Sequence, residues 1–384
     1  MPICASSVDA GTMFLQSARD DGKGNILYNT VRDCYREIPY DSEFEDTLKT
    51  QGAHYVRDDQ KLYVLGNDAY LQAGMAEFGA DLKPVFDEIL RRPMKDGILN
   101  PDSPKISMTI MRELLKACLG KDVGSARQDE VLYFSVPANP VDSSINNSFH
   151  CRMLEKFLRG LGYDARPLGE GLAVIYAENP KMYVSDKETI PFTGIGISCG
   201  AGMCNFALAE RGLPLDEFSV ARAGDYIDAN VARMTGQPKT KVLRVKEKKL
   251  DFGSLDQDDP IILALECYYD ELINYVFGIF ADRFKKNRGS IDHPIDIILS
   301  GGTALPPGLD IKVKKILDQM NLPFEVHEVR KAKDMLRAVA TGCYIRAKQT
   351  AKKLAAGKEV AADKVEGKKG VAADKTSDPL KSFE

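Results

Sequence analysis

Residues 297–309 read IILSGGTALPPGL, a stretch that starts apolar and ends in glycine and proline. The preceding residues extend the apolar run, so the sequence predicts a strand over Ile295–Gly302. Gly301 and Gly302 carry no side chain, which lets the backbone at the end of this strand come close to a neighbouring group. Pro307–Gly308 then predicts a turn.

A second glycine-rich stretch, GISCGAGMC, covers Gly196–Cys204 and also follows an apolar run. Three glycines within seven residues would let backbone N–H groups turn toward an anion, as phosphate-binding loops do. Such loops normally carry an acid and a threonine as well. The corresponding positions hold Ser198, Cys199, Met203 and Cys204. The loop is therefore either something else or a phosphate site that has lost part of its chemistry.

The composition is that of an ordinary globular protein. A chain of 384 residues with 44% hydrophobic residues is long enough for two domains, and a net charge of -4 gives no general attraction to nucleic acid. The first residues lack the features of a signal peptide, and no apolar stretch reaches the roughly 18 to 20 residues of a membrane span. We therefore expect a cytoplasmic protein.

The cysteine and histidine content excludes several kinds of site. Eight cysteines are scattered without a CxxC pair, and the four histidines are far apart in the sequence. This pattern predicts reduced, mostly buried thiols and argues against a zinc site or catalysis by histidine. The absence of tryptophan removes the largest stacking surfaces for single-stranded nucleic acid.

Strand and helix patterns alternate in both halves of the chain. The first residues predict a hairpin, and a strand over Val131–Ala138 precedes a helix in which every fourth residue is apolar. Those residues are Phe149, Met153, Phe157 and Leu161, with Ser143 and Ser144 as candidate caps. A longer helix before Ile295 carries Leu265, Tyr269, Leu272, Val276, Ile279 and Phe284 on one face. Two related α/β domains that face each other across a cleft would explain this pattern.

The segment 347–384 differs from the rest of the chain. It consists almost entirely of Ala, Lys, Glu, Asp and Gly, and it repeats VAADK after 11 residues. Such a composition cannot bury enough apolar surface to offset the entropy of ordering. We predict a mostly disordered, mildly basic tail that is transiently helical in its first part.

Five segments, in order, resemble the nucleotide-binding motifs of the actin superfamily, most closely the bacterial branch that contains MreB and MamK. VDAGT at Val8–Thr12 is similar to the first phosphate hairpin, and RRPMKDGIL at Arg91–Leu99 to a segment common in MreB-like chains. SVPANP with the later LGEGLAVIYA resembles a third motif. By this resemblance Asp9 holds Mg²⁺ through water and takes part in catalysis, Gly11 and Thr12 bind phosphate, and Glu170 positions the attacking water.

The fourth segment, ISCGAGMCNFALAERG, resembles the second phosphate hairpin, and ARAGDYID the helix start that follows it. The fifth, the opening SGGT stretch, matches the adenosine motif, in which the glycines lie against the purine. Between them, RVKEKKLDFG resembles the helix that supplies a lysine and a glutamate near the adenine and ribose, although such a triplet is also common on solvated faces. The nucleotide-binding residues implied are Ser198, Gly200, Gly202, Gly224, Asp225, Lys246, Glu247, Gly301, Gly302 and Thr303.

The resemblance implies an α/β, actin-like fold with two RNase-H-like domains, each with a smaller subdomain, around a nucleotide cleft. We expect domain I at residues 1–187 with its subdomain at about 36–65, domain II at 188–346 with its subdomain at about 223–261, and then the tail. It further implies ATP or ADP with Mg²⁺ in the cleft, and polymerisation into filaments that serve cell shape or intracellular positioning through unknown partner proteins.

Two departures from the family pattern concern hydrolysis. Ser198 stands where the family has the second metal-organising aspartate, and Met203 and Cys204 replace threonines. Losing one such element commonly costs roughly a hundredfold in rate, so we expect slow or absent ATP hydrolysis. The alternative is that another carboxylate, such as Asp225, compensates and hydrolysis is normal.

Other functions of the same fold remain open. A non-polymerising adaptor or pseudo-ATPase scaffold would keep nucleotide binding without filaments, and a sugar-kinase-like phosphotransferase would need a catalytic acid where Ser198 stands. The loop 119–130, LGKDVGSARQDE, has only Val123 as an apolar tip, so we expect neither direct membrane insertion nor direct nucleic-acid binding.

Overall fold

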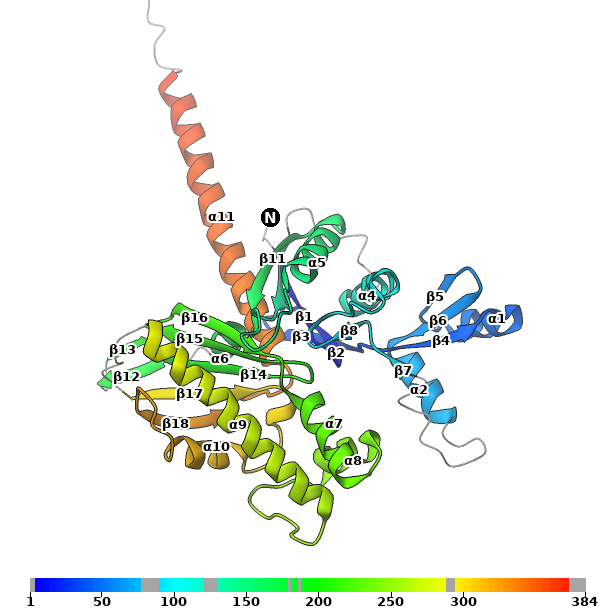
Figure 1. The fold of residues 1–384 in the computed structure, drawn as a ribbon. Coiled ribbons are helices and arrows are strands. Elements are labelled where there is room, and N and C mark those ends of the chain that lie inside the picture. The colour runs from blue at the N-terminus through cyan, green and yellow to red at the C-terminus, as the bar shows by residue number, and fades with distance from the viewer. Residues whose placement is uncertain are drawn as a thin grey trace, which may run out of the picture.

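The computed structural model describes residues 4–76, 90–120, 130–178, 181–185, 188–287 and 294–372 of this chain (Figure 1). Two five-stranded mixed sheets, each covered by helices, form the body, and a smaller four-stranded sheet forms a separate lobe. The α/β class predicted from the sequence is confirmed.

The first large sheet has the strand order β11-β10-β1-β2-β3. Its strands are β1 Ala5–Ala10, β2 Phe14–Asp20, β3 Ile26–Arg32, β10 Val131–Val136 and β11 Asp164–Gly169. Successive side chains of a strand point to opposite faces. Leu132 and Phe134 therefore pack under helices α4 Pro104–Leu119 and α5 Ser148–Gly160, while Tyr133 packs on the other face.

The second large sheet has the order β16-β15-β14-β17-β18. Its strands are β14 Gly194–Cys199, β15 Cys204–Glu210, β16 Leu213–Val220, β17 Ile295–Ser300 and β18 Val326–Lys331. Helices α9 Pro260–Asn287 and α10 Leu309–Leu317 cover one face, with α9 lying across it (Figure 1). The predicted apolar face of α9 is confirmed, since Leu265, Tyr269, Leu272, Val276 and Phe284 are buried there and Ile279 is partly buried.

Two helices join the sheets. α6 Glu170–Glu178 and α11 Ala338–Ala372 contribute to one hydrophobic cluster that contains residues of both sheets. They approach closely because small residues face each other: a Cβ on Gly342 would lie 1.8 Å from the carbonyl oxygen of Ala173. The Ser7 hydroxyl of β1 also donates to the carbonyl of Ala340, 2.7 Å away. The C-terminal helix therefore packs on the first sheet, although it follows the second in sequence.

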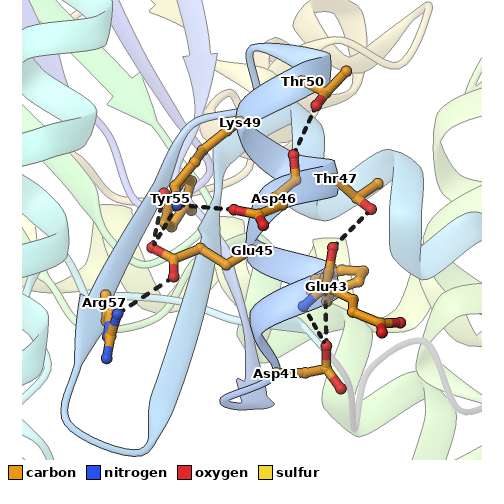
Figure 2. A network of polar contacts seen from close by, with 10 residues as sticks. Asp41, Glu43, Glu45, Asp46, Thr47, Lys49, Thr50, Tyr55 and Arg57 are labelled. Atoms are coloured by element: carbon orange, nitrogen blue, oxygen red, sulfur yellow. Dashed lines mark hydrogen bonds and ion pairs between the residues drawn. The ribbon is translucent and has the colours of Figure 1, made fainter.

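The small lobe consists of β4 Tyr35–Pro39, β5 Tyr55–Asp58, β6 Lys61–Leu65, β7 Leu90–Arg91, α1 Ser42–Gln51 and α2 Gly66–Ala76. Figure 2 shows how polar contacts fix α1. The Asp41 carboxylate accepts hydrogen bonds from two backbone N–H groups of the first turn, and Glu45 accepts from the Tyr55 hydroxyl at 3.1 Å and from Arg57. The lobe includes the whole segment 36–65 that we predicted as a subdomain.

The remaining elements are short. A tight hairpin, β8 Met94–Lys95 and β9 Ile98–Leu99, follows the small lobe, and β12 Lys181–Ser185 pairs with β13 Glu188–Pro191. Helices α7 Gly224–Thr235 and α8 Lys239–Lys248 form a second small unit beside the second sheet (Figure 1). A 3₁₀ turn, Gly302–Ala304, follows β17.

Two sequence predictions are wrong in part. The helix over 148–160 forms, but Phe149 is 59% exposed, and the buried residues are His150, Leu154, Phe157 and Leu158. The segment 347–372 continues α11 instead of being disordered, because Ala and Lys favour helix once a packed turn precedes them. Ala347 and Ala351 are still part of the core. Residues 373–384 and most of the loop 119–130 lie outside the described residues.

Candidate functional site

Two β-hairpin turns meet between the large sheets, and both were predicted to bind phosphate. The β1–β2 turn contains Gly11 and Thr12, and the β14–β15 turn contains Gly200 and Gly202. A Cβ on Gly202 would lie 2.9 Å from the Thr12 hydroxyl and 2.6 Å from the backbone nitrogen of Gly97 in the β8–β9 hairpin. Glycine is required there because three segments that are far apart in sequence touch at this point.

The turns leave backbone donors available. The N–H of Gly11 closes its own turn on the Phe14 carbonyl at 3.1 Å, and that of Gly200 does so on Met203 at 3.0 Å. Within the described residues, the N–H groups of Thr12, Ala201 and Gly202 make no hydrogen bond. Backbone N–H groups without a hydrogen-bond acceptor are suited to bind an anion, because the anion supplies the acceptor.

Asp9 lies near the end of β1, beside the first hairpin turn. Its Oδ1 accepts a hydrogen bond from the Ser135 hydroxyl at 2.7 Å, and that hydroxyl oxygen in turn accepts from the N–H of Ala10 at 2.9 Å. Burial raises the pKa of Asp9 to about 6, and the bond from Ser135 offsets part of this. The carboxyl is therefore held in one orientation and accepts a proton more readily than an exposed aspartate does.

Glu170 begins α6 and forms an acid pair with Asp9. Its Oε2 accepts hydrogen bonds from the Ser198 hydroxyl and the Asn205 amide, both at 3.0 Å. Burial and the charge of Asp9 raise the pKa of Glu170 to about 8, against the effect of these two donors. Ser198, predicted to stand at the metal, thus binds the side chain predicted to position water.

The sequence analysis missed Asn205. In the β14–β15 register Ser198 pairs directly with Asn205, so both side chains lie on the same face of the sheet and reach Glu170 together. The Asn205 Oδ1 accepts from the N–H of Ala138 at 3.0 Å, which fixes the amide orientation. Aligning the two strands around the predicted turn would have found this residue.

Asp225, the first acid of α7, lies between two cations. Arg92 Nη1 contacts its Oδ2 at 2.9 Å and Lys239 Nζ contacts its Oδ1 at 3.1 Å. Burial raises the pKa of Asp225, but the charges of Arg92 and Lys239 more than offset this and leave it below its ordinary value. Arg92, which the sequence analysis did not select, therefore connects the first half of the chain to α7.

The turn after β17 has the open backbone predicted for it. Gly301 has φ +93°, and a Cβ there would lie 2.2 Å from the carbonyl oxygen of Cys199. A Cβ on Gly302 would meet nothing within 4 Å. The Thr303 hydroxyl donates to the Gly200 carbonyl at 2.7 Å, which ties this turn to the second hairpin. A flat group could lie against Gly302 without disturbing the packing.

Helix α7 begins against the same turn. A Cβ on Gly224 would lie 2.5 Å from the Thr303 hydroxyl, and the Gly224 N–H donates to the Gly200 carbonyl at 3.2 Å. The structure therefore brings together nearly all the predicted binding residues.

The helix α8 prediction is only half matched by the geometry. Lys246 is buried, and its Nζ contacts Asp228 at 2.7 Å and lies 3.4 Å from where a Cβ on Gly224 would be. Glu247 is exposed and has no hydrogen bond or ion pair in the described part of the chain. A pocket of about 440 Å³ lies beside α8, but none of the predicted site residues lines it.

Metal binding at this site would have to go through water. Within the described ranges no three His, Cys, Asp or Glu side chains are grouped so that they could hold a metal ion directly. Mg²⁺ retains most of its waters in nucleotide sites and needs only one or two carboxylates. Asp9 fits that requirement.

Comparison with known proteins finds a family model and solved structures that match this chain. The family model described as Volactin matches residues 4–347. MreB5 of Spiroplasma citri bound to AMPPNP has a TM-score of 0.60 and 16% identity over 93% of this chain and 99% of that chain. The same protein bound to ADP has a TM-score of 0.61 and 16% identity over 92% and 98%. No curated protein sequence matches this chain. The predicted actin-like fold is confirmed.

Proposed function

This chain belongs to the Volactin family and has an actin-like fold, and we propose that it binds ATP or ADP with Mg²⁺ and assembles with copies of itself into filaments. One observation carries the proposal: two glycine hairpins, an acid pair and an uncovered glycine turn converge at one place between the sheets. These are the groups that a nucleoside triphosphate requires for its phosphates, its metal and its base.

Each part of the nucleotide has a chemically suited partner. The N–H groups of Thr12, Ala201 and Gly202 would bind phosphate oxygens, and the exposed backbone of Gly302 would face the purine. Asp9 would hold the water shell of Mg²⁺. The Spiroplasma citri relative of the same fold was crystallised with AMPPNP and with ADP, which supports a nucleotide in this cleft.

The acid pair argues for slow hydrolysis. Bound Mg²⁺ would supply the positive charge that phosphoryl transfer needs. Glu170 would orient the attacking water and take its proton, but in the nucleotide-free protein its pKa of about 8 leaves it mostly protonated at neutral pH. Ser198 adds no charge to attract the metal. Asp225 is already held by Arg92 and Lys239, so it is poorly placed to compensate.

We propose self-association into filaments by analogy with actin-like proteins, whose fold this chain has. The biological role of such a filament would depend on its partner proteins. A non-polymerising adaptor that binds nucleotide is the second candidate. The raised pKa of Glu170 fits such an adaptor, because it slows turnover without removing nucleotide binding. No helix in the described ranges combines the length and apolar character needed to cross a bilayer.

Phosphate release from the purified protein tests the hydrolysis part. We expect slow release from the wild type, an increase of about tenfold or more in Ser198→Asp, and no increase in Ser198→Ala, which removes the same hydroxyl without adding charge. Rapid wild-type turnover that Ser198→Asp does not raise would contradict this part. A labelled ATP analogue measures binding separately.

Pelleting and electron microscopy with and without ATP test assembly. Nucleotide-dependent filaments are the expected result. Their absence across salt, nucleotide and protein concentrations would favour the adaptor.

A further inference from the structure

Two cysteines face each other at the base of the second hairpin. Cys199 ends β14, Cys204 begins β15, and the two are direct partners in the strand register. The Cys204 thiol donates a hydrogen bond to the Cys199 sulfur, with the two Sγ atoms 3.4 Å apart. Both sulfurs are reduced thiols.

The backbone geometry of this pair suits a cross-strand bond. The next pair outward, Gly200 and Met203, is hydrogen-bonded, so Cys199 and Cys204 occupy a non-hydrogen-bonded position, because the two kinds alternate. Cα atoms at such positions lie about 4.5 Å apart, at the short end of the range that disulfides span. A bond here would form without unfolding the hairpin and would be strained enough to be reduced easily.

The two thiols differ in access. Cys199 is partly exposed, whereas Cys204 is 1% exposed. The hydrogen bond to Cys199, together with burial, raises the pKa of the Cys204 thiol well above its ordinary value. Cys204 therefore stays protonated, and Cys199 is the sulfur that a small oxidant reaches first.

We propose that Cys199 and Cys204 form a redox modification site, at which a peroxide closes a reversible disulfide across the second hairpin. The Cys199 sulfur attacks a peroxide oxygen, the O–O bond breaks, and a sulfenic acid and one water form. The Cys204 sulfur then attacks the Cys199 sulfur, and the hydroxyl leaves with the Cys204 proton as a second water. The two sulfurs together lose two electrons, and the peroxide is reduced to water.

The disulfide would act on the nucleotide cleft through the hairpin turn, a step that rests on the proposed function. Closing the sulfurs from 3.4 Å to a bond of about 2.05 Å pulls the ends of the turn together. That turn carries the Gly200 carbonyl, which accepts from Thr303 and from the N–H of Gly224. Disturbing one or two of these contacts predicts nucleotide binding that is about tenfold weaker in the oxidised protein.

The site itself is tested without nucleotide. Reduced full-length protein is titrated with hydrogen peroxide, its remaining thiols are alkylated, and its peptides are mapped by mass spectrometry. We expect the free thiol count to fall by two, a crosslinked Cys199–Cys204 peptide, and full recovery with dithiothreitol. The crosslinked peptide should persist in Cys267→Ala, a matched control at an exposed cysteine, and disappear in Cys199→Ala and Cys204→Ala.

Peroxide treatment that leaves both cysteines free, or that crosslinks only other cysteines or separate molecules, overturns the site. Because the mapping is done on the wild type, this conclusion holds even if a cysteine variant fails to fold.

The link to nucleotide is tested by measuring binding of a fluorescent ATP analogue to reduced, oxidised and re-reduced wild type. Weaker binding only in the oxidised form supports the switch, and equal affinity in a fully oxidised sample overturns it. If no form binds nucleotide, both the proposed function and the effect of the disulfide on nucleotide binding are contradicted. The thiol mapping still tests the modification site in that case.

Discussion

Replacing Glu170 with glutamine is expected to stabilise this protein, and to do so more strongly at high pH. Glu170 has a pKa of about 8 in the folded protein and an ordinary value of 4.5. Between these values the folded state holds a proton that the unfolded chain has released, so the free energy of unfolding falls as pH rises through this range. The glutamine of the variant has no such proton, and its amide oxygen can accept the same two hydrogen bonds from Ser198 and Asn205.

The size of the effect follows from the shift in pKa. Each pH unit between the two pKa values costs about 1.36 kcal/mol, so wild type loses roughly 4 kcal/mol between pH 4.5 and 8 that the variant retains. Asp9 titrates nearby with a pKa of about 6, and relief of its repulsion in the variant acts in the same direction. For a protein of this size, we expect the melting temperature of Glu170→Gln to exceed that of wild type, and this difference should grow by on the order of 5 °C as the pH rises through this range.

Thermal denaturation in nucleotide-free buffers at pH 5.0 and pH 8.5 measures this difference. Glu247→Gln is the matched control, because that glutamate is exposed and the same substitution there should change the melting temperature equally at both pH values. A Glu170→Gln variant that is less stable than wild type at pH 8.5, or whose advantage does not change with pH, would refute the argument that Glu170 is a buried, protonated acid.

Three further substitutions test the site. Gly302→Val should leave the melting temperature nearly unchanged, because a Cβ there meets nothing, yet weaken binding of an ATP analogue about tenfold or more; unchanged affinity would place the base elsewhere. Asn205→Ala removes a donor to Glu170, so it should lower the free energy of unfolding by about 1–3 kcal/mol, and by more at pH 8.5 than at pH 5.0. An equal loss at both pH values would show that Asn205 does not stabilise the ionised form of Glu170. Arg92→Gln breaks the partly exposed bridge to Asp225 and should cost about 1 kcal/mol in denaturant titration, with less cost at high salt; a cost that salt does not change would show another cause.

The glycine positions could be predicted from the sequence because a cluster of glycines at the end of an apolar run is itself a signal of close backbone approach. Gly202 and Gly301 are needed where backbones touch, and any side chain would collide there. The alternation of strands and helices likewise follows from the apolar pattern, which is why the α/β class and the buried face of α9 were predicted correctly. The partners of the polar site residues depend on strand register and on distant segments, so Asn205 and Arg92 were missed.

The two errors have equally physical causes. A helix turns once in 3.6 residues, so a series taken at every fourth residue from Phe149 to Leu161 drifts by about a third of a turn and leaves the buried face. Composition suggested disorder from residue 347, but it does not record that Ala347 and Ala351 are packed against the first sheet. A helix anchored by those contacts continues at little cost through Ala- and Lys-rich sequence.

Ser198 connects the stability of the cleft to its chemistry. A carboxylate at that position would place a third acid beside Glu170, whose pKa the charge of Asp9 already raises. The folded cleft would then need a cation to offset the repulsion among the three acids. The serine hydroxyl instead donates to Glu170 and adds no charge, so the cleft is satisfied without a metal. This bond lowers the pKa of Glu170, while burial and the charge of Asp9 still raise it to about 8. The same substitution therefore stabilises the empty cleft and removes a charge that would attract the metal. Glycines that still allow nucleotide binding, together with a missing acid, are expected of a protein in which bound nucleotide stabilises the structure and is hydrolysed slowly.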